Sequence, residues 1–200
     1  MGNTTRQSTS RKGATNKRRA GTTHRPTSAG RISEDQYYLN IAREVAARST
    51  CLRRKFGAVI VKNKQIISTG YCGAPRGTVN CSDIGHCFRN ELGAKPGEHY
   101  EWCRSVHGEA NAIIHASRLE MMGGTLYLVG MNSATHEITA DAEPCRMCKR
   151  MIINAGIETV VIQAGNGQIR RVKVSEWIRN HLGEFRKVNG KLVPIRPQGY

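Results

Sequence analysis

Two short stretches of the sequence carry residue types that bind metals. VHGEANAIIHA contains His107 and Glu109 at the start of an apolar stretch that we expect to be helical. EPCRMC contains Cys145 and Cys148, which we expect to open a second helix, where the positive end of the helix dipole favours thiolates. Two thiolates within one turn and one imidazole nitrogen make a set of three zinc ligands. The fourth tetrahedral position stays open, as in catalytic zinc sites.

Each stretch alone has simpler explanations. A lone Cys-x-x-Cys also occurs in redox motifs and as half of a four-cysteine structural zinc site. The combination is more specific, because H-x-E followed by P-C-x-x-C is the pattern of zinc-dependent nucleobase deaminases. In that chemistry zinc lowers the pKa of a water toward about 7. The carboxylate at Glu109 then moves the water proton to the ring and to the departing amine.

The hydrophobic pattern predicts the elements that position these residues. Ser33 is the expected N-cap of the first helix, with Tyr38, Ala42, Ile41 and Val45 on its apolar face. The expected elements are a helix over 35–49, a hairpin over 56–71 that turns at 62–64, helices over 107–119 and 145–155, strands over 125–130 and 157–163, and a short helix over 174–182. This alternation of helices and strands indicates a layered α/β domain.

Two connecting segments stand out for their length. Residues 73–101 are rich in Gly, Pro and Cys and have little periodicity, and such long loops are typically functional or tied down. Residues 131–143 form a polar link before Cys145, which we interpret as an added hairpin at the pocket edge or an oligomer contact.

The charge is unevenly distributed. The chain has 200 residues and a formal net charge of +16, and residues 1–31 hold eight Lys or Arg and no acid. We therefore expect a disordered basic tail over 1–32, a zinc-dependent domain over 33–182, and an irregular basic tail over 183–200. The chain beyond residue 31 holds 23 basic and 15 acidic residues, which favours anionic ligands such as nucleotides or nucleic acid.

The sequence also bears on location. No stretch is long and apolar enough to span a membrane, and the start has no apolar region typical of a secretory signal. Seven cysteines in such a chain indicate a reducing compartment and metal ligation rather than disulfides. We therefore expect a cytoplasmic protein without membrane contact.

Residues 33–163 resemble the deoxycytidylate (dCMP) deaminase branch of the cytidine deaminase superfamily. The similar stretches are STCLRRKFGAVIVKNKQIISTGYCGAPRG, VHGEANAII, TLYLV and PCRMCKRMIINAGIETVV. The resemblance implies a three-layer α/β/α fold with a central five-stranded mixed sheet. It also implies hydrolysis of dCMP to dUMP and ammonia, which feeds dTMP supply. Zinc is then held by His107, Cys145 and Cys148, with Glu109 as the proton shuttle.

The resemblance carries further expectations for the substrate pocket. Family members form closed homo-oligomers, and some respond to dCTP and dTTP. Gly108 stands where the family usually has alanine, so its backbone N–H is expected to hold the pyrimidine carbonyl while the lost methyl widens the pocket. Cys72 stands where the family has a sugar-contacting asparagine, and Arg76 and Arg104 are the candidates for the 5′-phosphate.

Some dCMP deaminases carry a second, structural zinc. The resemblance implies that Cys51, Cys81, His99 and Cys103 hold it here. Cys87 and His86 are alternative ligands, and buried free thiols without a metal are the simpler explanation. A metal would offset the entropy of ordering so long a loop.

Two other function classes stay open. One is a deaminase acting on tRNA adenosine, on cytosine in single-stranded DNA or on a modified cytosine nucleotide, which the basic domain and tail favour. The other is a non-catalytic zinc module that binds nucleic acid, in which Glu109 has no role. The stretch CKRMIINAGIETVV favours the mononucleotide branch, so nucleic-acid contact through the tail is the weaker expectation.

Overall fold

The computed structural model describes residues 1–2, 30–95, 98–139 and 142–195. The chain divides into two units, Met1–Arg31 and Ile32–Tyr200. The predicted disordered tail over 1–32 lies almost wholly outside the described residues, and the fold is that of the second unit.

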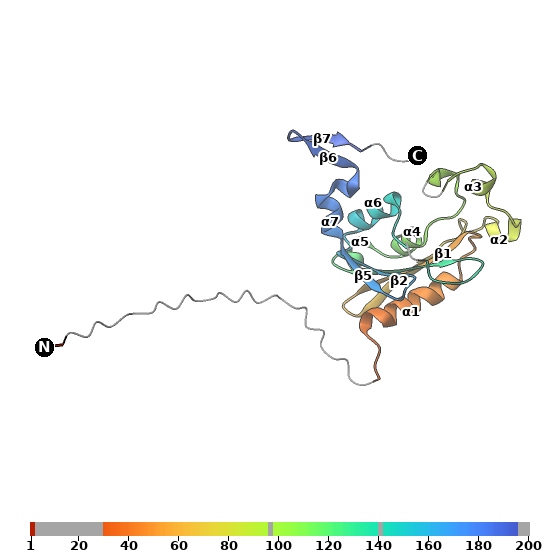
Figure 1. The fold of residues 1–200 in the computed structure, drawn as a ribbon. Coiled ribbons are helices and arrows are strands. Elements are labelled where there is room, and N and C mark those ends of the chain that lie inside the picture. Colours follow the sequence, from red (N-terminus) through yellow and green to blue (C-terminus); the bar gives the residue numbers. More distant parts are fainter. Residues whose placement is uncertain (3–29, 96–97, 140–141, 196–200) are drawn as a thin grey trace. The chain divides into compact units, whose positions relative to one another are not determined.

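A five-stranded sheet organises this unit, with strand order β2-β1-β3-β4-β5 (Figure 1). Its strands are β1 (Arg54–Lys62), β2 (Gln65–Tyr71), β3 (Thr125–Asn132), β4 (Thr159–Gln163) and β5 (Ile169–Lys173). β3 and β4 are parallel, and the other neighbouring pairs are antiparallel. The predicted mixed five-stranded sheet is thus confirmed, although the hydrophobic pattern alone did not identify β5.

The β1–β2 hairpin turns where the sequence predicted. Lys62 pairs with Gln65, and the two residues between them, Asn63 and Lys64, have positive φ values of 51° and 64°. Positive φ at both central residues is the signature of the type I′ turn, whose twist matches that of the flanking strands.

The helix α1 (Glu34–Ala47) begins at its predicted cap, because the Ser33 hydroxyl accepts a hydrogen bond from the Gln36 N–H at 3.2 Å. Its buried face differs in part from the prediction. The fully buried side chains are those of Tyr38, Leu39, Ala42 and Ala46. Ile41 and Val45 are only partly buried at the border of this face. The spacing of the apolar residues predicts the helix correctly. The face that is buried in the structure is rotated slightly from the predicted apolar face.

The other helices are short. They are α2 (Cys81–Ile84), α3 (Phe88–Glu91), η1 (Tyr100–Trp102), α4 (Gly108–Ile114), α5 (Arg118–Met121), α6 (Arg146–Ala155), α7 (Val174–Arg179) and η2 (His181–Gly183). Residues 73–101, expected to be one long loop, therefore contain three helical turns. The single helix predicted over 107–119 is two helices, because Ser117 and Glu120 form a capping box that starts α5.

The sheet separates two hydrophobic clusters. Ala58 and Ile60 of β1 point into one, whereas Val59 and Val61 point into the other. α1 covers the second face, and α4, α6 and α7 lie on the opposite side (Figure 1). This arrangement is the predicted three-layer architecture.

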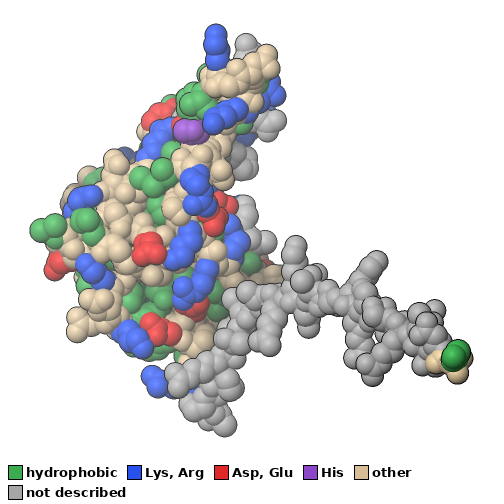
Figure 2. Space-filling model, turned by 90° about the vertical axis from the view of Figure 1, so that its left-hand side faces the viewer, with side chains coloured by type: hydrophobic (Ala, Val, Ile, Leu, Met, Phe, Trp, Pro, Cys, Tyr) green, Lys and Arg blue, Asp and Glu red, His purple; other side chains and the backbone are tan. Residues whose placement is uncertain are grey.

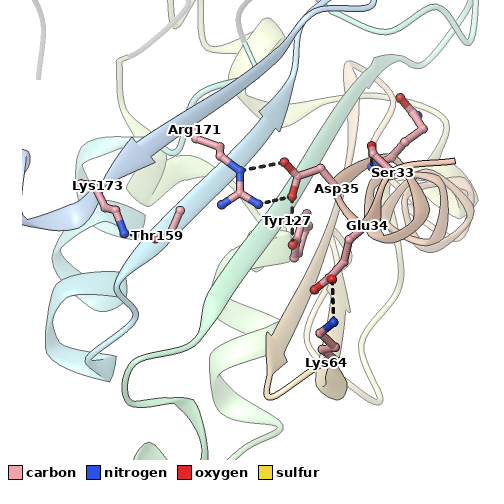
Figure 3. A network of polar contacts seen from close by, with 9 residues as sticks. Ser33, Glu34, Asp35, Lys64, Tyr127, Thr159, Arg171 and Lys173 are labelled. Carbon is pink, nitrogen blue, oxygen red and sulfur yellow. Dashed lines mark hydrogen bonds and ion pairs between the residues drawn. The ribbon is translucent and has the colours of Figure 1, made fainter. Parts of the chain in front are cut away.

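A polar network fastens the start of α1 to the sheet (Figure 3). Arg171 of β5 pairs with Asp35, its Nε donating to Asp35 Oδ2 at 2.7 Å, and the Tyr127 hydroxyl of β3 donates to the same carboxylate at 3.2 Å. Glu34 pairs with Lys64 at 3.5 Å. The Asp35 side chain is only 17% exposed, so solvent screens its interactions less than those of an open surface pair.

The prediction of an irregular tail over 183–200 is wrong for the described part of that segment. Its described part contains a two-stranded sheet of β6 (Phe185–Val188) and β7 (Lys191–Pro194). Asn189 and Gly190 form the turn with φ values of 50° and 78°, and an Asn-Gly pair is a strong hairpin signal that the sequence interpretation overlooked. The hairpin stands out from the body of the domain, with hydrophobic and basic side chains over its surface (Figure 2).

The link after β3 turns back on the strand end. Thr139 N–H donates to Gly130 at 2.8 Å, and Met131 bridges Ile138 in the antiparallel sense. Of the two alternatives for residues 131–143, this contact favours the added hairpin.

Among the helices in the described part of the chain, none has the length and apolar character needed to cross a membrane.

Candidate active site

α4 lies along β2 because small residues and side-chain hydrogen bonds hold the two together. The Ser68 hydroxyl donates to the Ala112 carbonyl at 2.7 Å, and Asn111 Nδ2 donates to the Tyr71 carbonyl at 2.8 Å. A Cβ atom at Gly70 would lie 2.2 Å from Ala112 N and 2.3 Å from Gly108 O. Only glycine allows this approach, which fixes the first turn of α4 against the sheet.

His107 and Glu109 occupy the start of α4. His107 is the N-cap residue, with extended backbone angles, and Glu109 lies in the first turn. Gly108 between them corrects one expectation. A Cβ there would meet the Phe56 and Gly70 carbonyl oxygens at 3.1 and 3.2 Å. The missing methyl therefore frees space against the sheet backbone and does not widen the pocket.

Cys145 and Cys148 come from the start of α6, which packs near α4. Cys145 is the N-cap residue, and Cys148 follows in the first turn and is fully buried. α6 ends at Gly156, whose φ of 76° is the left-handed conformation typical of a helix C-terminus. Both helices thus direct their N-termini toward one point.

The three predicted ligand atoms converge at that point. His107 Nδ1 lies 3.4 Å from Cys145 Sγ and 3.4 Å from Cys148 Sγ. Bond lengths of 2.3 Å to sulfur and about 2.0–2.1 Å to nitrogen place the donors of one tetrahedral zinc about 3.6 Å apart. The donor types and separations therefore fit zinc. His107, Cys145 and Cys148 leave room for one further ligand.

The pKa shifts of the side chains at the site also fit zinc binding. A hydrogen bond from Cys148, assisted by His107, lowers the pKa of Cys145 to about 4. Burial lowers the pKa of His107, but the hydrogen bond to Cys145 and the charge of Glu109 outweigh it and leave the pKa raised. The lowered pKa of Cys145 favours its thiolate, which is the form that binds metals.

Glu109 is buried beside this group. Only 3% of the residue is exposed, and burial raises the pKa of its carboxyl group, while His107 opposes the rise. A carboxyl group with a raised pKa can both accept and return a proton near neutral pH. Its position one turn from the ligands suits proton transfer at the open ligand position.

His107, Glu109 and Cys145 line a cavity of about 420 Å³. That volume lies within the roughly 300–1,000 Å³ typical of small-molecule sites. Its wall includes Cys72 and Arg104 of the predicted substrate residues. The Cys72 sulfur accepts a hydrogen bond from the Gly108 N–H, so the group expected to hold the pyrimidine carbonyl faces this thiol. Arg76 is not among the lining residues, and it donates to His115 Nε2 at 2.9 Å.

The residues predicted for a second zinc are only partly brought together. Cys51, Cys81, Cys87 and Cys103 line the same cavity. Within the described residues, no three of the predicted second-site donors lie within 4.8 Å of one another. His99 pairs instead with Glu101 at 2.9 Å and stacks on Trp102, and His86 lies 3.7 Å from Glu91. The second site stays a prediction.

Several lining residues gave no signal in the sequence. Tyr100 places its ring edge-on to His107 with centroids 5.2 Å apart, and Phe56 lies on β1 beside the cavity. Arg53 and Arg89 also line it. Arg89 and Tyr100 come from the segment without periodicity, where nothing local predicts which side chain turns inward.

Comparisons with known proteins identify a family for this chain. A profile of the cytidine and deoxycytidylate deaminase zinc-binding region matches residues 32–164. The deoxycytidylate deaminase of Mycobacterium phage D29 is 41% identical over 132 residues, which are 64% of this chain and 91% of that protein.

The comparisons include two further proteins of lower identity. The deoxycytidylate deaminase of Schizosaccharomyces pombe is 35% identical over 131 residues, 66% of this chain but only 37% of that longer protein. The crystal structure of dCMP deaminase from the cyanophage S-TIM5 in complex with dCMP and dUMP is 27% identical. It covers 64% of this chain and 78% of its own, with a TM-score of 0.45.

Proposed function

The chain belongs to the cytidine and deoxycytidylate deaminase zinc-binding family, and we propose that it hydrolyses the 4-amino group of dCMP to give dUMP and ammonia. The observation that carries the proposal is the convergence of His107, Cys145 and Cys148 beside the buried carboxyl group of Glu109. A substrate with an anionic group suits the basic cavity wall.

The residues of the site have separate roles in the proposed reaction. His107, Cys145 and Cys148 would hold zinc, which when bound supplies a Lewis acid that makes water nucleophilic near pH 7. Glu109 accepts the proton of the attacking water and delivers it to ring N3. The same carboxylate then takes the remaining proton from the oxygen added at C4 and passes it to the amine that leaves, so that one proton carrier serves both halves of the reaction.

The site's surroundings support this division. Tyr100 and Phe56 give the cavity apolar walls that limit water access and offer faces to a flat ring. Cys72 is buried, and burial together with the Glu109 charge raises the pKa of its thiol well above the usual range. Cys72 therefore stays a neutral thiol beside the carboxyl group and does not compete for its proton.

Ammonia release tests the proposal. We expect the purified, zinc-loaded chain to release ammonia from dCMP faster than from CMP, cytidine or dCTP. Glu109→Gln should lower kcat by about 10²–10⁴-fold, because it removes the proton carrier while keeping the side-chain shape. Zinc content should remain at wild-type level in this variant. Turnover near that of the wild type would contradict the role of Glu109.

The same panel tests the other substrate classes. Single-stranded DNA and tRNA belong in it, since the chain is basic as a whole. Ammonia from either polymer, with none from dCMP, would replace the mononucleotide proposal by a polynucleotide deaminase. A non-catalytic zinc module would release ammonia from none of them and would tolerate Glu109→Gln.

Further properties follow from the family and are proposed here. We propose a closed homo-oligomer that responds to dCTP and dTTP, which light scattering and titration of the two effectors test. Seven free thiols support a cytoplasmic, reducing environment. Cys51, Cys81, His99 and Cys103 are the donors that a second, structural zinc would use, so two metal equivalents per chain would support that site and one would exclude it.

A further inference from the structure

The hairpin of β6 and β7 is the most exposed secondary structure of the domain. It projects beyond α7 (Figure 1), and ten of the eleven residues from 185 to 195 are exposed, while Val193 is half-buried. A two-stranded ribbon that buries so little surface is marginally stable by itself in water. Its side chains are therefore available to a partner.

The charge of this hairpin is entirely positive. It contains Arg186, Lys187 and Lys191 and no acid. None of the ion pairs formed among the described residues includes these three side chains. Glu184, the acid that directly precedes β6, is already paired with Arg150 at 2.5 Å. The hairpin thus presents three cations whose charge the domain does not neutralise.

The basic strand β5 shows the contrast. Its Arg171 pairs with Asp35 of α1. Its Lys173 pairs with Glu158 at 2.8 Å, although both of these side chains are more than half exposed. Exposed cations elsewhere in this domain therefore do find acids, and the cations of the hairpin differ from them in having none.

The register of the hairpin mixes cations and apolar side chains on both of its faces. Cross-strand partners share a face, and side chains alternate between faces along each strand. One face carries Arg186, Val188, Lys191 and Val193, and the other carries Phe185, Lys187, Leu192 and Pro194. A ribbon that packs on a protein core gathers its apolar side chains on one face. This ribbon has no such face.

A polyanion with flat apolar groups fits this mixture. Lys and Arg side chains bind phosphates, and aromatic side chains stack on bases. Arg186 and Lys191 are diagonal neighbours on one face, a placement that separates such residues by about 7–8 Å. Like charges at this distance repel each other, and bound phosphates remove that cost. On the other face, Lys187 lies next to Phe185, which is 39% exposed.

We propose that the β6–β7 hairpin binds single-stranded nucleic acid, with Arg186, Lys187 and Lys191 on the phosphates and Phe185 stacked on a base. These contacts use phosphates and base faces, which DNA and RNA share, so the hairpin takes either strand. The inference does not rest on the proposed function, because none of these four residues lines the catalytic cavity.

The salt dependence of binding measures the contribution of the hairpin. Residues 1–31 hold eight further Lys or Arg and bind polyanions on their own account, so variants of the full chain must be compared. We would follow the zinc-loaded chain on labelled oligothymidylate and oligouridylate of about 20 nucleotides by fluorescence anisotropy, at about 0.05–0.3 M salt. Both strands should bind alike.

Replacing Arg186, Lys187 and Lys191 together by Gln removes three phosphate contacts. Each contact on a single strand contributes about 0.7 to the slope of log K against log[salt], so the slope should fall by about 2. That change corresponds to about 100-fold weaker binding at about 0.1 M salt. Circular dichroism and zinc content would check that the variant is folded.

A second variant separates stacking from charge. Phe185→Leu removes the ring and keeps every cation, so it should weaken binding by about 5- to 100-fold at each salt concentration and leave the slope unchanged. The matched control replaces Arg43, Arg48 and Lys95 by Gln, which removes the same charge from exposed positions outside the hairpin. It should keep the wild-type slope and affinity, because salt screens distant charges.

The outcomes separate the hairpin from other binding surfaces. A wild-type slope in the triple hairpin variant would overturn the proposal, and so would an equal loss in the control, because binding would then follow net charge. Wild-type affinity in Phe185→Leu, or competition by polyglutamate as strong as that by oligothymidylate, would overturn the assignment to nucleic acid.

Two further measurements locate the strand. Excess dUMP should leave oligonucleotide binding unchanged, whereas competition would place the strand in the catalytic cavity and overturn the hairpin site. A triple variant that keeps its affinity but loses mass in light scattering would show that the hairpin joins copies of the chain instead. Hairpin-dependent binding without ammonia release from dCMP would refute the proposed function alone and support this site.

Discussion

Gly70→Ala is the sharpest test of how β2 positions the reactive groups. The added Cβ would lie 2.2 Å from Ala112 N and 2.3 Å from Gly108 O, whereas ordinary contacts begin at 3.4 Å. The partners are backbone atoms and cannot rotate away, so α4 must move off the sheet by about 1 Å. Because Gly108 lies between His107 and Glu109, both functional side chains would move with it.

The expected magnitudes follow from this displacement. Overpacking typically costs about 1–3 kcal/mol of unfolding free energy. A misplacement of about 1 Å at a reacting group can lower the rate by about 10²-fold. We therefore expect Gly70→Ala to lower kcat/KM for dCMP by about that factor at a temperature where the variant is fully folded.

Two other glycines give matched controls. A Cβ at Gly57 would lie 2.2 Å from Ala42 O, a clash of the same size, but against α1 on the opposite face of the sheet. Gly57→Ala should lose comparable stability and keep kcat/KM within about threefold when folded. A Cβ at Gly73 would meet Thr50 Oγ1 at an ordinary 3.4 Å, so Gly73→Ala should change neither quantity.

Urea unfolding and ammonia release would be measured on all three variants, with zinc content as a check. The reasoning fails if Gly70→Ala keeps wild-type kcat/KM while Gly57→Ala loses as much stability as expected. It also fails if the two variants lose activity equally, because activity would then follow stability and not the position of α4.

Three further predictions concern other parts of the molecule. Burial, together with the charge of Asp35, raises the pKa of Tyr127. Unfolding should then release a proton above about pH 10, so the free energy of unfolding falls with rising pH there, and falls less in Tyr127→Phe when followed by urea unfolding. A zinc chelator should abolish ammonia release and lower Tm by about 5–10 °C, corresponding to roughly 2–3 kcal/mol of lost ligand binding, and added Zn²⁺ should restore both. Truncation after Glu184 should leave Tm within about 2 °C and activity unchanged, because the side chains of β6 are exposed; a larger loss in calorimetry would show that the hairpin packs on the domain.

The parts of the fold that could be predicted depend on local patterns. The Ser33 cap and the hairpin turn at residues 62–64 depend on neighbouring residues, and the structure has both. β5 was missed because four of its five residues are exposed and three are basic, so it has no apolar alternation to detect. The break between α4 and α5 follows from the Ser117 capping box, which competes with an otherwise continuous apolar pattern.

The residues of the site also fall into those that could be predicted from local patterns and those that could not. His107, Cys145 and Cys148 could be identified because the residue types and spacing needed for zinc are rare in combination. The orientation of Gly108 could not be predicted, since the atoms its Cβ would meet belong to β1 and β2. Arg89 could not be predicted either, because its burial comes from the packing of a segment with no periodic pattern of its own.

The order of α4, β3 and α6 along the chain has a consequence for biosynthesis. His107 lies before β3, and Cys145 lies 38 residues further on, after that strand has crossed the sheet. A chain emerging from the ribosome therefore presents the imidazole before the two thiols, and the full ligand set exists only once the start of α6 has been made. The two thiols emerge last and stay accessible until α6 packs near α4, and an accessible thiolate is the form that oxidants attack. A complete site for the ion therefore forms late in synthesis, after β3 and the start of α6 have been made.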